Sequence, residues 1–173
     1  MILKIVIVVV ILIAVILVFA ATKPATLHVQ RSMVVNAPPE KVFALVNDLR
    51  RWQQWEPQED STTTRTFSGA PSGVGAASEW NSRGRAGKGK MSVIESQPSS
   101  RVVVKVDFLK PFESHNMNEF MVAPADGATK VTWSWQGQNL YFMKVMGIFV
   151  NMDRMIGKHF EDGLAKMKRV AEQ

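Results

Sequence analysis

Cysteine is absent from this 173-residue chain, and histidine occurs only three times. The lack of cysteine excludes disulfide bonds and thiol chemistry. His28, His115 and His159 are far apart in the sequence and lack the spacing of metal ligands. His159 and Asp162 are one helical turn apart, a pattern typical of a charged helix face. We therefore predict no metal site and no cofactor, and the pattern identifies no catalytic residue.

Runs of basic residues interleaved with exposed aromatic side chains are also absent. The formal net charge is +6, but the 21 lysine and arginine residues are scattered along the chain. This distribution predicts no nucleic-acid binding. A charge of this size suits a surface that faces anionic lipid headgroups, or simply a soluble basic domain.

One long apolar run is present, at the N-terminus. From Ile5 to Ala21 it is unbroken, and only Lys4 interrupts the whole segment. About 20 residues at about 1.5 Å each suffice to cross a hydrocarbon core of about 30 Å. We predict a single transmembrane anchor over residues 1–22, a short linker over 23–26 and one domain over 27–173. The alternative is a cleaved signal peptide, because Val18-Phe19-Ala20 resembles a cleavage site.

We expect the membrane to be a bacterial-type inner membrane. The charged groups that flank the apolar run do not predict the orientation of the anchor. Lys4 and the α-amino group on one side are matched by Lys23 and Arg31 on the other. The anchor also lacks a Gly-x-x-x-Gly face, so the usual signal for close helix pairing is absent and the oligomeric state stays open.

The part after the anchor is rich in predicted strands. Leu27–Val35 has apolar residues at its odd positions, Arg31 excepted. Six further extended segments follow, separated by turns that contain Gly, Pro or Ser, so neighbouring strands should be antiparallel. They run roughly over Thr62–Phe67, Ala76–Asn81, Lys88–Glu95, Arg101–Leu109, Phe112–Val122 and Lys130–Gln136.

Helices are expected after the first strand and at the C-terminus. Pro38, Pro39 and Glu40 are typical of a helix start, and Trp52 and Trp55 lie on one side of a short second helix. From about 140 to 172, apolar residues recur every three or four positions, which predicts one long amphipathic helix. Gly147 and the cap-type residues at 151 and 153 predict a break or kink in it, which would divide a mobile gate from a fixed segment.

The strands alternate so that one face of the sheet is apolar. Val102, Val104, Val106 and Phe108 share a face, opposite Lys105 and Asp107 on the same strand. This face and the apolar stripe of the last helix must cover each other. The prediction is an α+β fold, in which seven antiparallel strands pack against a long C-terminal helix, with two short helices after the first strand.

Several motifs carry a resemblance to a known family. The segment Val34–Phe43, the pair Trp52-x-x-Trp55, Gly73-Val74-Gly75 and Phe108-Leu109-Lys110-Pro111-Phe112 precede a Thr132-Trp133 strand and the closing helix. Together they resemble the polyketide cyclase/dehydrase branch of the SRPBCC superfamily, the START-related helix-grip proteins. The resemblance covers about residue 27 to the C-terminus. It implies a curved sheet that grips the C-terminal helix, with a deep apolar cavity between them.

The preferred function is a membrane-anchored module that binds or transfers a lipid or another apolar small molecule in this cavity. One alternative is a cyclase- or dehydrase-like enzyme that uses the same cavity, and another is a non-catalytic interaction module without a ligand. A cyclase would need a buried carboxylate near its substrate, but Glu79, Glu95 and Glu119 lie opposite the apolar face. The sequence therefore favours a binding function over an enzymatic one. The residues predicted to contact the ligand are Trp80, Met91, Phe108, Phe120, Trp133, Trp135, Phe149 and Met152.

Overall fold

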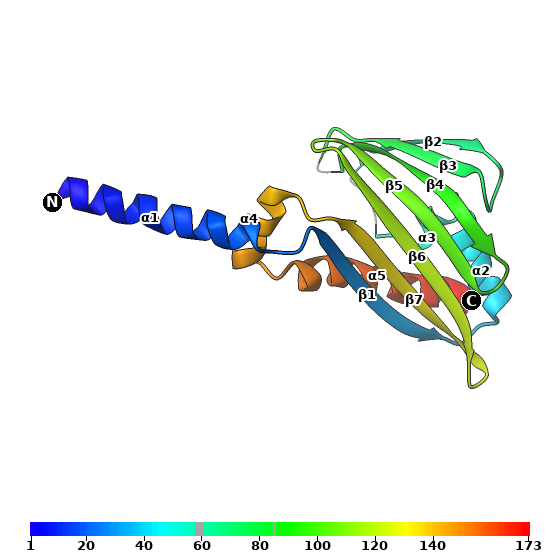
Figure 1. The fold of residues 1–173 in the computed structure, drawn as a ribbon. Helices are drawn as coiled ribbons and strands as arrows, with labels where there is room; N and C mark the ends of the chain where they lie inside the picture. The colour runs from blue at the N-terminus through cyan, green and yellow to red at the C-terminus, as the bar shows by residue number, and fades with distance from the viewer. Residues whose placement is uncertain (58–60, 85) are drawn as a thin grey trace.

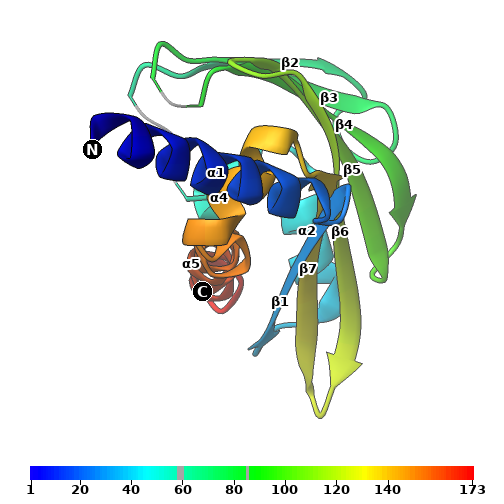
Figure 2. The same ribbon diagram turned by 60° about the vertical axis from the view of Figure 1, so that its left-hand side comes forward.

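The chain folds into a curved sheet that wraps around a C-terminal helix, with one helix projecting away from this body (Figure 1). The computed structural model describes residues 1–57, 61–84 and 86–173. Figure 2 shows the sheet curving over one side of the C-terminal helix, while the other side of that helix faces solvent. The predicted α+β helix-grip architecture is confirmed.

The sheet has seven antiparallel strands in the order β1-β7-β6-β5-β4-β3-β2. All neighbours are sequential hairpins except for one pair, in which the first strand lies beside the last with Val29 opposite Trp135. This pairing brings the residues after the N-terminal helix next to those before the C-terminal helices. The strands are β1 Thr26–Val35, β2 Thr64–Gly69, β3 Ala76–Asn81, β4 Lys88–Gln97, β5 Arg101–Lys110, β6 Ser114–Ala125 and β7 Ala128–Gln138.

All seven predicted strands form, although most of their ends differ by one to three residues from the prediction. The concave face carries the apolar side chains, as the alternation predicts: Val102, Val104 and Val106 are buried on β5, while Lys105 is exposed. The apolar core therefore lies between this face and the helices.

Two short helices, α2 (Pro39–Asn47) and α3 (Trp52–Trp55), close one end of the concave face. Pro39 occupies the first turn of α2, where a missing N–H costs nothing. The indole N–H of Trp52 donates to the Val46 carbonyl at 2.9 Å, and that of Trp55 donates to Leu45 at 3.0 Å. The two buried tryptophans thus satisfy their polar atoms locally and anchor both helices in the core.

The C-terminal helix is divided in two, as its cap-type residues predict. α4 spans Tyr141–Phe149 and α5 spans Met152–Ala171. The Asn151 side chain accepts a hydrogen bond from the Arg154 backbone N–H at 2.9 Å and so caps α5. α5 packs on the sheet with Phe160, Leu164 and Met167 buried, whereas no residue of α4 is buried.

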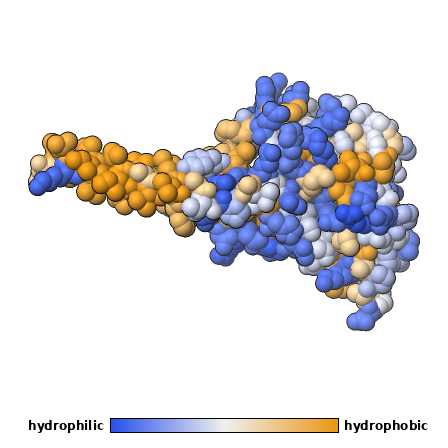
Figure 3. All heavy atoms as spheres, viewed as in Figure 1, coloured by the Kyte–Doolittle hydropathy of each residue, from blue (hydrophilic) through white to orange (hydrophobic). Residues whose placement is uncertain are grey.

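The first helix, α1 (Ile2–Ala21), extends outside the domain as an almost uninterrupted hydrophobic rod (Figure 3). It is long and apolar enough to span a membrane, and none of its most apolar stretch is buried within the protein. In Figure 1 its C-terminal end lies beside α4. A helix with these properties can serve either as an anchor or as a signal sequence.

Candidate ligand cavity

A cavity of about 450 Å³ lies between the concave face of the sheet and the N-terminal half of α5. This volume is within the range of about 300–1,000 Å³ that is typical of small-molecule sites. Most of its lining is apolar or aromatic. The lining residues are Trp52, Glu56, Pro57, Trp80, Ala86, Met91, Val106, Phe108, Asn118, Trp133, Trp135, Met155, Ile156, His159 and Phe160.

Two aromatic pairs define its walls. On the sheet, the Trp80 and Phe108 rings meet edge to face with centroids 5.3 Å apart. On the helix side, the Trp133 and Phe160 rings stack at 4.2 Å. Gly89 makes room for the first pair, because a Cβ at this position would lie 2.3 Å from the Trp80 ring. The walls are therefore fixed by ring packing and leave the space between them empty.

A few polar groups reach the cavity. The buried Asn118 side chain accepts a hydrogen bond from the Trp133 indole N–H at 2.9 Å. Glu56 is paired with Arg65 at 3.1 Å, and both side chains are largely shielded from solvent. Fixed polar groups of this kind in an apolar lining orient a ligand and can hold water or a proton.

His159 is the titratable group on α5 that borders the cavity. The residue is exposed, but the centroid of its ring lies 6.0 Å from that of the Trp133 ring. Desolvation lowers the pKa of His159 below its ordinary value, and Lys166 adds to this effect while Asp162 opposes it. His159 is exposed, as expected for a residue on the outer face of the helix, but it also borders the cavity, which the sequence did not predict. Asp162 does belong to that face, where it pairs with Lys158.

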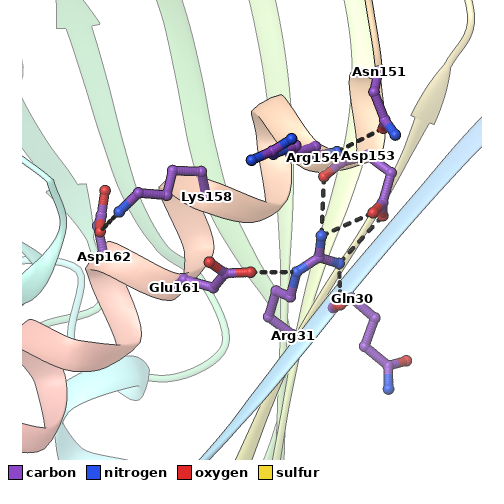
Figure 4. Close-up of polar contacts among 8 residues, drawn as sticks. All are labelled: Gln30, Arg31, Asn151, Asp153, Arg154, Lys158, Glu161 and Asp162. Carbon is purple, nitrogen blue, oxygen red and sulfur yellow. Dashed lines mark hydrogen bonds and ion pairs between the residues drawn. The ribbon is translucent and has the colours of Figure 1, made fainter.

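Arg31 fixes α5 over the cavity (Figure 4). Its Nε donates to Glu161 at 2.8 Å, and its Nη2 donates to the Asp153 carboxylate at 2.8 Å and to the Asp153 carbonyl at 3.1 Å. Gly157 allows this approach, since a Cβ there would lie 2.0 Å from Arg31 Nη2. The one charged residue on the inward face of the first predicted strand thus joins β1 to the first three turns of α5.

The structure places five of the eight predicted ligand residues on this cavity: Trp80, Met91, Phe108, Trp133 and Trp135. Alternation along the strands puts them all on the concave face. Alternation determines the direction of these side chains, because a strand has only two faces and the apolar one must be covered.

The other three predicted residues do not line the cavity. Phe120 is fully buried behind it, with ring contacts to Trp52, Trp55 and Trp133 at 5.1–5.8 Å. Phe149 and Met152 border a separate hollow of about 410 Å³ between the linker and the α4–α5 turn. They were misplaced because the break at Val150 and Asn151 turns α4 away from the sheet.

Ten of the fifteen lining residues were not predicted as ligand contacts, and four of them show why. Asn118 lies two residues before Phe120 on β6 and therefore points to the same face, so the sequence pattern did contain this signal. Met155, Ile156 and Phe160 follow the helical stripe, but only the position of the helix break shows which half of the stripe meets the empty space.

The strand carboxylates lie outside the cavity, as predicted. Glu95 and Glu119 both pair with Arg101, and Glu79 lies 3.9 Å from Lys90. His115 also faces outward, where its Nδ1 lies 2.6 Å from Asp107. Within residues 1–57, 61–84 and 86–173, no group of three or more His, Cys, Asp or Glu side chains is placed to hold a metal ion.

Solved structures share this architecture at low sequence identity. A protein from Chromobacterium violaceum is 16% identical with a TM-score of 0.61, over 87% of this chain and 99% of its own. The di-domain ARO/CYC BexL from the BE-7585A biosynthetic pathway is 15% identical with a TM-score of 0.65, over 90% of this chain and 53% of its own. The Aha1 dimer from Colwellia psychrerythraea is 16% identical with a TM-score of 0.56, over 84% and 96%. At such identities the likeness shows the fold alone.

Sequence comparison gives the family. None of the curated proteins matches the chain. One family model, described as polyketide cyclase / dehydrase and lipid transport, matches residues 26–172. This range begins at the first strand and includes the sheet, the cavity and α5, while α1 lies outside it. The chain therefore belongs to the polyketide cyclase / dehydrase and lipid transport family.

Proposed function

We propose that this protein is a membrane-tethered domain that binds or transfers a lipid or another apolar small molecule in the cavity under α5. The observation that carries the proposal is the preformed cavity of about 450 Å³ with aromatic and aliphatic walls. Burial of a ligand against such walls contributes about 25 cal/mol per Å² of apolar surface removed from water. The family description, which includes lipid transport, supports the same ligand class.

The tether rests on α1. Its 20 residues are apolar except for Lys4, and they pack mainly against α4. Only a short segment separates α1 from β1, so a retained anchor would keep the cavity close to the bilayer. A ligand that partitions into lipid would then be concentrated where the domain is held.

The interaction module without a ligand is disfavoured by the same cavity. That alternative predicts that the protein's own side chains fill the space between sheet and helix. Phe120 and its tryptophan neighbours do fill one end, but the region between Trp80 and Met155 stays open.

Native mass spectrometry of the full chain, purified in mild detergent, tests the ligand proposal. The expected result is a bound apolar molecule that organic extraction recovers. Ala86→Trp places an indole in the cavity and should abolish its recovery. Ala123→Trp, on an exposed position of β6, is the matched control and should retain the molecule. Wild-type protein that is reproducibly empty, or equal recovery from both variants, would refute the proposal.

A cyclase- or dehydrase-like enzyme is the second candidate, because the cavity is not wholly apolar. Asn118 and His159 both border it, and a neutral imidazole can take up a proton from a substrate. Turnover of a poly-β-ketone substrate that is lost in His159→Asn, with ligand binding retained, would support this candidate. Binding without any turnover would reject it.

A further inference from the structure

α4 presents an apolar surface that the rest of the described chain leaves partly exposed. Phe142, Met146 and Phe149 follow each other at steps of four and three, so they share one side of the helix. Their exposed fractions are 41%, 44% and 71%. Phe112, from the turn between β5 and β6, is 57% exposed and its ring lies 4.7 Å from that of Phe142. We call these four residues the α4 patch.

The α4 patch adjoins the C-terminal end of α1. The Tyr141 hydroxyl donates a hydrogen bond to the Leu17 carbonyl at 2.7 Å, and α1 contacts α4 but neither the sheet strands nor α5 to a comparable extent. Both ribbon views show α4 beside the last turns of α1 (Figures 1 and 2). An apolar helix placed at the end of a membrane span lies at the depth of the lipid headgroups.

The charges around the α4 patch fit an anionic lipid surface. Lys23 follows α1 with its ammonium group 5.3 Å from the Phe19 ring, as expected for a lysine that reaches from apolar surface toward headgroups. Lys110 precedes Phe112 closely, and Lys144 lies on α4 itself. Two acids are near these cations: Glu113 follows Phe112, and Asp153, which borders the same hollow as Lys23 and Lys144, is paired with Arg31.

We propose that α4 and Phe112 lie in the interfacial layer of the bilayer that α1 spans. This inference rests on the membrane anchor of the proposed function and adds a second point of membrane contact. Two contacts fix the orientation of the domain, whereas a single span followed by a short linker leaves it free to tilt. The bilayer, and not a protein partner, covers the α4 patch.

Fluorophore labelling of the full chain in lipid nanodiscs tests this placement, and the natural absence of cysteine allows single-site labelling. Phe149→Cys and Met146→Cys report on the α4 patch, and Leu12→Cys reports on the span. Val74→Cys is the matched control, because Val74 is an exposed apolar residue in the turn between β2 and β3, far from α1 in Figure 1. An environment-sensitive dye is attached at each site, and lipids with shallow or deep spin labels are the quenchers.

The expected result is quenching of the dye at Leu12→Cys by deep spin labels, and of both α4 dyes by shallow ones, with blue-shifted emission. The dye at Val74→Cys should stay water-like. If the α4 dyes also stay water-like while the dye in α1 is quenched, the interfacial placement is refuted and the anchor stands. If the dye in α1 is not quenched, both are refuted. Blue-shifted α4 dyes that no spin-labelled lipid quenches would indicate a protein partner and refute the proposal. None of these outcomes depends on ligand binding.

Discussion

Phe120 and Phe108 lie on the same concave face, yet truncation of each should have a different consequence. Phe120 is fully buried, with three aromatic neighbours, whereas Phe108 is only half-buried and borders the cavity. Phe120→Ala removes a packed ring from the core and should cost about 3–5 kcal/mol. For a chain of this size, about 2–4 °C per kcal/mol converts this loss into a fall in Tm of roughly 6–20 °C.

Phe108→Ala should reduce stability much less than Phe120→Ala, but it should reduce ligand retention more. Full burial of such a side chain is worth about 1.5–3 kcal/mol, so half-burial gives about 0.8–1.5 kcal/mol and a fall in Tm of roughly 2–6 °C. The truncation enlarges a space that already exists and creates no new closed cavity in the core. Trp80, its ring partner at 5.3 Å, loses one contact.

The assay is thermal unfolding of the detergent-solubilised full chain, followed by the fluorescence of its five tryptophans, with ligand retention measured by native mass spectrometry well below Tm. Phe120→Ala should unfold early but retain ligand, and Phe108→Ala should unfold near the wild-type temperature but lose ligand. Equal falls in Tm, or ligand loss in Phe120→Ala alone, would refute the division of this face into core and cavity wall.

Three further predictions concern the cavity and its cover. Asn118→Leu leaves a buried indole N–H without an acceptor and should destabilise the fold by about 1–3 kcal/mol in denaturant titrations, whereas Asn118→Asp should destabilise it less because it keeps an acceptor oxygen. The fold lowers the pKa of His159, so the neutral imidazole is favoured in the folded state. Its contribution to stability is present above the ordinary pKa of about 6.5 and is lost as pH falls through the lower, folded-state pKa. Tm should therefore drop on acidification, and His159→Asn should make this drop smaller. Gly157→Ala should displace the Arg31 guanidinium and speed hydrogen exchange in the first turns of α5. Gly147→Ala is the control, because its Cβ would lie 3.5 Å from the nearest atom, and it should leave this exchange unchanged. Equal exchange rates in the two variants would contradict the role of Arg31.

The sheet and its apolar face could be predicted because strand alternation and turn residues are local signals. Val102 to Phe108 on β5 shows this: each inward residue has its direction fixed by its neighbours in sequence. The pairing of β1 with β7 is different, because it joins segments that are far apart in the chain, and no local pattern specifies it. The family resemblance implied a curved sheet, but this pairing itself was not predicted.

The limits of the prediction at the site come from the helices. A stripe at helical spacing shows which side of a helix is apolar, but not what covers it. Phe149 and Phe160 belong to the same predicted stripe, yet Phe149 is 71% exposed at the end of α4, whereas Phe160 is 4% exposed on the side of α5 that packs on the sheet. Arg31 is a second example. In the sequence it is an exception on an apolar strand face with no identified partner, and only the tertiary fold places Asp153 and Glu161 opposite it.

The break between α4 and α5 determines how the cavity lies relative to α1. A continuous helix from 141 to 171 would carry its first turns away from α1 or lift its last turns off the sheet. The Asn151 cap allows α4 to follow α1 while α5 stays on the concave face, and Arg31 holds the first turns of α5 in place. Because Met155 and His159 in those turns border the cavity, the open space lies under the half of α5 nearest to α4. The helix break thus puts the cavity at the end of the domain nearest to α1, which is the end that a retained anchor would hold against the membrane.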